Sequence, residues 1–288
     1  MVSHARRRFL FAAFAFAGTA GRIRAQELYP AKPIRVLVGL AAGGGTDTVI
    51  RSIAPYLTAR LGQPVVVENR AGAAGIIAAE YVAKAPPDGY TLLMAPSGVL
   101  VTNVVMRAKL PYRLEDFAPI TLLCTLPLVL IVAPNVPVRS LAEVAPFIAS
   151  SPARRSIGGG GAAFQLTVAV FARRLGAGFE YIQYKGSNEA VQAVMAGDLP
   201  FALSDVGPAQ AALRGGRLFA PARTPASVLS VLRARAHDVI QMPEVRAALL
   251  AQHAEPAGES GEAFGRLVAA DVRRWDEARR AAGIPLLD

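Results

Sequence analysis

The sequence predicts an α/β protein of two lobes, each built on a mainly parallel sheet. Short runs rich in β-branched residues alternate with stretches of helical apolar spacing, which is typical of strand–helix–strand units. A strand, a glycine cluster and a helix follow one another at 34–61 and again at 155–175. We therefore expect one such unit in each lobe, with a cleft where strand ends meet helix starts.

The first part of the chain predicts three strands and two helices. The strands are Ile34–Gly39, Val65–Glu68 and Thr91–Met94, each bounded by Gly, Pro or Asn. Between them, Thr48–Leu61 and Ile76–Lys84 have the apolar spacing of helices. This alternation of strands and helices predicts the first lobe.

The later part repeats the pattern. It predicts strands at Leu126–Ala133, Arg155–Ile157, Phe179–Tyr184 and Leu199–Ser204, with helices at Phe164–Leu175 and Asn188–Met195. Ser140 and Glu143 have the spacing of a capping box. The last segment, 226–288, is predicted to be largely helical, with Trp275 anchoring the final helix. Its alternating charges, Asp271 among them, predict a solvated face.

The first 25 residues predict an export signal. Arg6-Arg7-Arg8 is basic, Phe9–Ala20 is apolar but too short to span a bilayer, and Ala25 ends a small-residue cleavage site. The Arg6-Arg7 pair also fits the twin-arginine pattern, so both that route and the general secretory route stay open. Removing this segment lowers the net charge from +10 to +5.

Composition excludes several classes of protein. The remaining positive charge is spread thinly and forms no basic stripe with aromatic residues, so we expect no nucleic-acid partner. A mild positive field still favours anionic ligands. The only cysteine, Cys124, lies among leucines and is predicted to be a buried structural thiol rather than a nucleophile. No second apolar run is long enough for a membrane span.

The first glycine cluster is a candidate anion site. Gly43, Gly44 and Gly45 follow a strand, and Thr46 and Asp47 open the next helix. Unpaired N–H groups at a helix start attract anions, and Thr46 adds a hydroxyl donor. The alternative is a tight turn in which Thr46 or Asp47 only caps the helix. Walker and dinucleotide-binding glycine spacings are absent.

The second lobe offers similar groups. Gly158–Gly161 is either a second anion-binding loop or a flexible linker. Lys185 could attract a carboxylate or simply be solvated, and Gly186 and Ser187 are the better candidate donors. Asp205 either accepts a hydrogen bond from a ligand or caps a helix.

Other chemistry is sparse. Arg70 either clamps a carboxylate or ties Glu68 or a helix end. No histidine lies near a nucleophile signal, no Cys/His cluster has metal spacing, and no cofactor is predicted; the histidines are His4, His237 and His253. Acid–base catalysis by Asp47 and Asp205 stays an open alternative.

A series of motifs resembles the Bug-type receptors, the periplasmic substrate-binding proteins of tripartite tricarboxylate transporters. In order, they are Tyr29-Pro30, Lys32–Arg35, Ala42–Asp47, Leu61–Arg70, Ala85–Leu92, Leu110–Tyr112, Asp116–Ile120, Tyr184–Gly186, Ala196–Asp198, Phe219–Pro225 and Ala281–Ile284. They cover nearly all of the chain after the signal.

The resemblance implies a type II, two-lobe Venus-flytrap fold that binds a small carboxylate, without catalysis. It implies a periplasmic monomer whose partners are that ligand and the permease subunits. The implied lobes are 26–124 with 219–288, and 125–218. The resemblance also implies that Asn103 borders the cleft. The implied ligand-binding residues are Gly43, Gly44, Gly45, Thr46, Asp47, Ser97, Gly159, Gly160, Gly161, Ala162, Tyr184, Lys185, Gly186 and Asp205.

The chain departs from the family pattern in two places. Ala162 and Gln165 replace a threonine and a histidine, which removes a hydroxyl donor. After Leu218 the chain lacks several dozen family residues, including a core strand, so we expect an unpaired edge and exposed apolar surface. Three hypotheses follow: a carboxylate receptor, a degenerate receptor that no longer binds, and an exported α/β enzyme.

Overall fold

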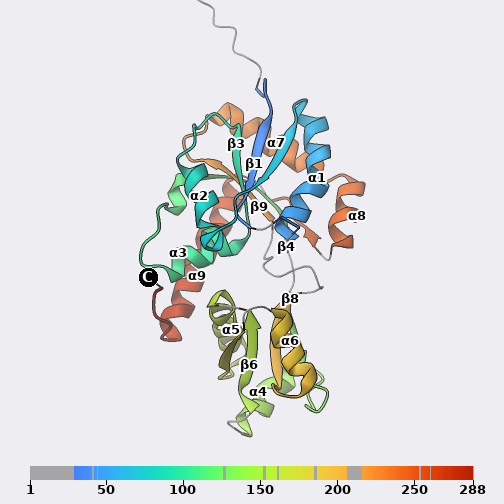
Figure 1. Cartoon of the computed structure of the whole chain (residues 1–288), viewed down its shortest axis with the longest axis vertical. Coiled ribbons are helices and arrows are strands. Elements are labelled where there is room, and N and C mark those ends of the chain that lie inside the picture. Colours follow the sequence, from blue (N-terminus) through green and yellow to red (C-terminus); the bar gives the residue numbers. More distant parts are fainter. Residues whose placement is uncertain are drawn as a thin grey trace, which may run out of the picture.

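A computed structural model shows two sheets arranged one above the other along the long axis of the molecule (Figure 1). It describes residues 29–40, 42–43, 45–125, 128–151, 154–160, 162–184, 187–205, 216–252, 254–259 and 261–287. We call the six-stranded sheet with its helices the first lobe, and the four-stranded sheet with its helices the second lobe. The export signal at 1–25 lies outside the described residues.

Three parallel strands form one side of the six-stranded sheet. They are β1 (Ile34–Val38), β2 (Val65–Asn69) and β3 (Thr91–Ala95), in the order β2-β1-β3. The helices α1 (Gly45–Leu61) and α2 (Ile76–Ala83) connect them, as the alternating pattern predicts. Because the three strands are parallel, their carboxyl ends lie at one edge of the sheet.

The other side of this sheet is antiparallel. β9 (Gly216–Pro221) lies between β3 and β4 (Phe117–Thr125), and the short β10 (Glu255–Pro256) pairs with β4. Every residue of β9 is buried. The residues around the predicted deletion site therefore do not form an unpaired edge, because they take a central place in the sheet.

Helices cover both faces of the six-stranded sheet. α1, α7 (Ala226–Ile240) and α8 (Pro243–Ala251) enclose one apolar cluster. The second cluster lies under α2, a π-helix at Gly98–Thr102, α3 (Asn103–Met106) and α9 (Gly261–Ala281). The C-terminal segment is helical, as predicted. Trp275 is buried in the second cluster, which confirms its anchoring role.

The second lobe is a four-stranded sheet of order β5-β8-β6-β7. β6 is parallel to both β7 and β8, whereas β5 is antiparallel to β8. α6 packs against all four strands, and α5 packs against β6 and β7 on the other face. The strands are β5 (Leu128–Val132), β6 (Ser156–Gly160), β7 (Glu180–Tyr184) and β8 (Phe201–Asp205), and the helices are α4 (Leu141–Ala149), α5 (Ala162–Leu175) and α6 (Ser187–Ala196).

Two local expectations need correction. Ser140 precedes α4 in an extended conformation, but its hydroxyl makes no capping hydrogen bond. Glu143 accepts from the N–H of Arg139, with an Oε2–N distance of 2.7 Å. The sheets are mixed rather than mainly parallel. β9 and β5 each follow a crossing of the chain from one lobe to the other, and both are antiparallel to the strands with which they pair.

The single cysteine is inert in this fold. Cys124 lies in β4 with no exposed surface, packed in the first apolar cluster. Burial raises the pKa of its thiol to about 11, so it stays protonated at neutral pH. This confirms the structural thiol. In the described parts of the chain, no helix has the length and apolar character needed to cross a membrane.

Candidate functional site

Three loops meet at the carboxyl edge of β1, β2 and β3. A side chain at Gly39, after β1, would place its Cβ 2.8 Å from the Cα of Gly75, after β2. A Cβ on Gly75 would lie 2.5 Å from a methyl of Val99, after β3, and Gly75 has a φ of +88°. The sequence therefore needs glycine at both positions to bring the three loops together.

The backbone is strained at this edge. Ala73 and Ala74 have φ values of 46° and 55°, which are costly for residues with a Cβ. Asn103 holds this turn by donating to the carbonyl of Ala74 at 3.1 Å. The π-helix Gly98–Thr102 follows β3 directly, and π-helical turns occur frequently at functional sites. Strain and irregular helix thus concentrate at the edge where the predicted loops lie.

Asp47 organises the first glycine cluster. Its side chain is 3% exposed, and its carboxylate accepts from the N–H of Gly43 at 2.9 Å. Arg51 donates to both carboxylate oxygens at 2.9 and 3.0 Å, and Asn69 donates at 2.9 Å. Asn69 also donates to the carbonyl of Leu40. With its oxygens so occupied, Asp47 positions the loop rather than serving as a free acceptor or base.

This network gives Asp47 a pH-dependent role in stability. Burial alone raises the pKa of Asp47, but hydrogen bonds from Arg51, Gly43 and Asn69 outweigh it, so the pKa is lowered. A carboxylate with a lowered folded-state pKa stabilises the fold above the pH where an unfolded aspartate titrates, about 4. That contribution disappears as the pH falls through the folded-state pKa.

We expect Asp47→Asn to lower the free energy of unfolding by about 1–2 kcal/mol at pH 7, because a charge-assisted network becomes neutral. Urea unfolding at several pH values would measure it. The difference from the wild type should be constant from pH 7 to about 5 and shrink below about 4. Asp238→Asn, which breaks an exposed pair with Arg235, is the control and should cost under about 0.5 kcal/mol. A difference that grows in acid would contradict the prediction.

Two hydroxyl groups at this edge are buried without a partner. Thr46 is 1% exposed and Ser97 is 4% exposed, and neither hydroxyl oxygen has a hydrogen-bond partner in the described structure. Ser97 precedes the π-helix but does not cap it. Next to them, a Cβ on Gly43 or Gly98 would meet no atom within 4 Å. The edge therefore combines two buried, unused donors with open space beside the neighbouring glycines.

The second lobe brings its predicted residues to a matching edge. Gly160 at the end of β6 pairs with Tyr184 at the end of β7, and Asp205 ends the neighbouring β8. α5 begins at Ala162 and α6 at Ser187, so two helix starts lie beyond these strand ends. The expected clustering is thus present in the described part of this lobe.

The first three residues of the second glycine cluster, Gly158–Gly160, belong to a strand rather than to a loop. Gly158 and Gly159 lie inside β6, where added Cβ atoms would approach Ala190 of α6 and Phe164 of α5 to 3.0 Å. Their missing side chains let both helices pack closely on the strand. The flexible-linker alternative is therefore wrong for these residues. Gly44, Gly161, Lys185 and Gly186 lie outside the described residues.

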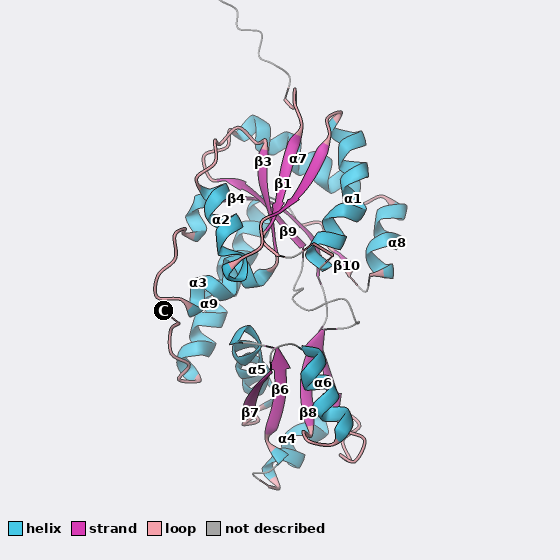
Figure 2. Ribbon diagram, viewed as in Figure 1, coloured by secondary structure: helices cyan, strands magenta, loops and turns pink. Residues whose placement is uncertain are grey.

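The two edges point toward each other. In Figure 2, β1 begins at the top of the first lobe and runs down, while β6 points up from the second lobe. Thr46 and Ser97 therefore lie on the side of the first lobe that is turned toward Gly160, Tyr184 and Asp205.

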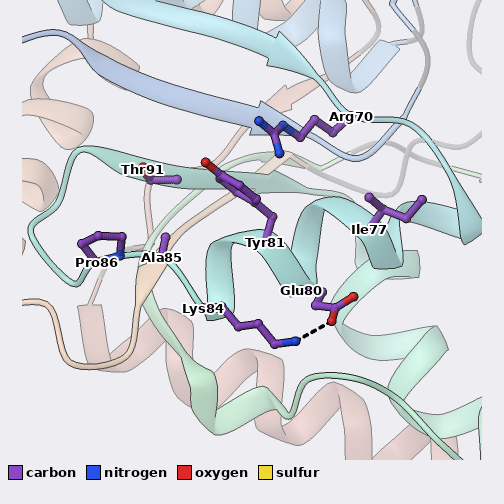
Figure 3. A pocket seen from close by; sticks show the side chains of 8 residues that line it. All are labelled: Arg70, Ile77, Glu80, Tyr81, Lys84, Ala85, Pro86 and Thr91. Atoms are coloured by element: carbon purple, nitrogen blue, oxygen red, sulfur yellow. Dashed lines mark hydrogen bonds and ion pairs between the residues drawn. The ribbon is translucent and has the colours of Figure 1, made fainter.

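Arg70 lies in a different environment from the residues at the strand edge. Its guanidinium carbon lies 3.9 Å from the ring centroid of Tyr81, and Figure 3 shows it above that ring. Both line a groove of about 440 Å³ beside α2, where Lys84 pairs with Glu80 at 2.6 Å. The groove shares no residue with the edge described above. Arg70 does not pair with Glu68, which lies 3.4 Å from Arg35 instead.

Sequence reasoning missed Arg51 and Asn69. For Arg51 the sequence did carry a signal, which is its four-residue spacing from Asp47 in a predicted helix. Residues at this spacing lie on one helix face and can form an ion pair. Asn69 comes from the next strand, and nothing local connects it to Asp47.

These features define a class of protein: two α/β lobes with open, polar strand ends turned toward each other, as in two-lobe binding proteins. The profile of the tripartite tricarboxylate transporter family receptor matches residues 49–219. BugT of Bordetella pertussis is 30% identical over 315 aligned positions, covering 94% of this chain and 95% of BugT. The chain belongs to the tripartite tricarboxylate transporter receptor family.

Solved structures agree with this assignment. An R. palustris protein with adipate has a TM-score of 0.71 at 25% identity, covering 90% of this chain and 100% of that one. MatC from Rhodopseudomonas palustris with bound malate has a TM-score of 0.64 at 25% identity, covering 87% and 99%. These similarities confirm the two-lobe fold of periplasmic binding proteins.

The comparisons also bear on the missing segment. The alignment with BugT is longer than the 288 residues of this chain, so BugT contains residues that have no counterpart here. The family match ends at Phe219, next to the predicted deletion site. In the fold, Phe219 lies within the buried central strand β9.

Proposed function

We propose that this chain is an extracytoplasmic receptor that captures a small carboxylate between its two lobes. The observation that carries the proposal is the pair of buried, unpartnered hydroxyls of Thr46 and Ser97 at an open strand edge. A buried donor without a partner costs about 1–3 kcal/mol, and a ligand carboxylate would supply the acceptor. The two similar proteins solved with adipate and malate support this class of ligand.

Each lobe would contribute to capture. In the first lobe, the start of α1 adds unpaired N–H groups and the positive end of the helix dipole, while Asp47 keeps the loop in shape. In the second lobe, the starts of α5 and α6 and the ends of β6, β7 and β8 face the ligand. Contacts from both lobes favour the closed state, which is a hinge closure around the ligand.

The finer parts of the proposal follow from family membership. We propose that the lobes divide at 26–124 with 219–288, and 125–218, and that residues 1–25 direct export to the periplasm. The permease of a tripartite tricarboxylate transporter would receive the ligand. No catalytic step is proposed, since Asp47 is fully engaged and Cys124 is protonated and buried.

Isothermal titration tests this proposal directly. The chain without residues 1–25 would be titrated with malate, adipate and citrate, and with adipamide, the neutral analogue of adipate, as the control. We expect saturable heat with a stoichiometry near one for at least one carboxylate and none for adipamide. A sample that melts cooperatively but gives no heat with any of the three acids would contradict the proposal and favour the degenerate receptor.

The enzyme alternative makes a different prediction. If Asp205 were an acid–base group, Asp205→Asn would abolish conversion of the bound acid while preserving its affinity. If the protein is a receptor, chromatography should detect only unchanged ligand after prolonged incubation with the protein. Product formation that depends on Asp205 would replace the receptor assignment.

A further inference from the structure

A cavity of about 320 Å³ lies away from the strand edges, between α5 of the second lobe and α9 of the first. Its floor is the half of the four-stranded sheet that α5 does not cover. Leu130 of β5 and Leu203 of β8 face each other there as a cross-strand pair. Phe171 of α5 and Trp275 of α9 close the sides, so the wall is mostly apolar and aromatic. This volume suits a small ligand.

Two arginines line the cavity where it adjoins a second one. Arg174 of α5 and Arg274 of α9 line both this cavity and an adjoining one of about 370 Å³, so they mark the place where the two meet. Arg173 and Glu277 line only the adjoining cavity. Among the described residues, the side chain of Arg174 makes no ion pair, hydrogen bond or ring contact.

The nearby acids do not neutralise this charge, because Glu277 lines the adjoining cavity together with Arg173, Arg174 and Arg274. Arg274 contacts Asp271 at 2.6 Å, but Asp271 also pairs with the buried Arg217 at 2.7 Å. Two guanidinium groups thus share one carboxylate, and the side chain of Arg274 remains 51% exposed. A net positive charge beside an apolar pocket is complementary to an anion that carries an apolar tail.

We propose that this cavity is a second ligand site, for an amphipathic monocarboxylate. The tail would occupy the space between Leu130, Leu203 and Trp275, and the carboxylate would lie between Arg174 and Arg274. The site shares no residue with the edge formed by Thr46 and Ser97, and it goes beyond the proposed capture of a carboxylate between strand ends. Because α5 and α9 belong to different lobes, an occupant would also join the lobes at this point.

The protein carries its own reporter for this site, since Trp275 is its only tryptophan. Intrinsic fluorescence would be followed while the chain lacking residues 1–25 is titrated with octanoate. Octanol has the tail without the charge, and acetate has the charge without a long tail. We expect a saturable change with octanoate and, at equal concentration, at least about tenfold weaker responses with the other two, because the site uses both parts of the ligand.

Matched variants locate the response. Arg174→Gln should weaken octanoate binding by about tenfold or more, because it removes a charge-assisted contact. Arg173→Gln makes the same charge change one residue away, outside this cavity, and should shift the affinity by less than about twofold. Val170→Phe fills the cavity without changing charge and should abolish the response while the melting temperature shows a folded protein.

Three results would overturn the proposal. The first is an equal response to octanol, which would indicate apolar adsorption. The second is unchanged affinity in Arg174→Gln. The third is loss of the response in a Thr46→Val, Ser97→Ala double variant, which would mean that Trp275 senses the strand-edge site from a distance. Retained octanoate binding in that double variant supports the proposal even if the strand-edge site binds nothing.

Discussion

The double variant Thr46→Val, Ser97→Ala should lose ligand affinity by about a hundredfold or more while keeping its stability. Each hydroxyl would donate to a charged carboxylate, a hydrogen bond that contributes about 1.5–3 kcal/mol, or about tenfold or more in affinity. Neither hydroxyl has a partner in the described structure without ligand, so removing it breaks no internal bond. Titration calorimetry gives the affinity, and thermal melting gives the stability.

The melting temperature of this variant should be equal to that of the wild type or higher, because burying an unpaired hydroxyl is unfavourable. Thr102→Val is the matched control. Thr102 is also 4% exposed and its hydroxyl also lacks a partner, but it lies at the far end of the π-helix from Ser97. The affinity of the Thr102→Val variant for the ligand should stay within about twofold of the wild-type value. If Thr102→Val reduced affinity as much as the double variant, the assignment of Thr46 and Ser97 would be wrong.

Asp271→Ala should be the most destabilising single change outside the apolar cores, at about 3–5 kcal/mol. It would leave Arg217 buried in the centre of the sheet without its countercharge. Burial already lowers the pKa of Arg217, and the charge of Asp271 opposes that shift. Urea unfolding of the variant, with the midpoint and slope compared, would measure the loss.

Replacing both partners tests the physical cause. The Nε and Nη1 atoms of Arg217 have no partner in the described structure, so the pair is incompletely satisfied. Arg217→Leu with Asp271→Leu should therefore recover most of the stability, since apolar groups often replace such pairs at little cost. Asp276→Ala, which removes partly exposed pairs with Arg279 and Arg280, should cost under about 1 kcal/mol. A double variant as unstable as Asp271→Ala would contradict this account.

This ion pair joins the strand at the predicted deletion site to the C-terminal helix. Arg217 lies in β9, and Asp271 lies in α9, which packs on β4 and reaches α5 of the second lobe. The strand that fills the centre of the first sheet is thus tied to the helix that contacts both lobes. Disrupting it should affect lobe packing as well as local stability.

Much of the fold could be predicted from local patterns. The first three strands and α1 and α2 occur within a few residues of their predicted bounds, because β-branched runs and helical apolar spacing act within one element. Local patterns do not predict β4, although its residues Phe117–Ile120 belong to a family motif. Pro119 interrupts its pattern, and the pairing with β9 shifts register there.

The candidate site was predicted in part. Glycine clusters and polar residues after strands identified the two edges, since strand ends in parallel sheets gather on one side. The sequence alone could not separate a ligand donor from a positioning residue. Asp47 and Thr46 are adjacent, yet Asp47 is held by four hydrogen bonds from three residues and the hydroxyl of Thr46 is held by none.

The sequence by itself determined the two α/β lobes, the family and the strand edges, because these depend on periodicity and motif order along the chain. Only the tertiary structure decided three other features. It placed β9 in the middle of the first sheet, turned Asp271 from a solvated face to a buried ion pair, and brought Arg174 beside Arg274. Each depends on contacts between residues 50 or more positions apart, which no local pattern encodes.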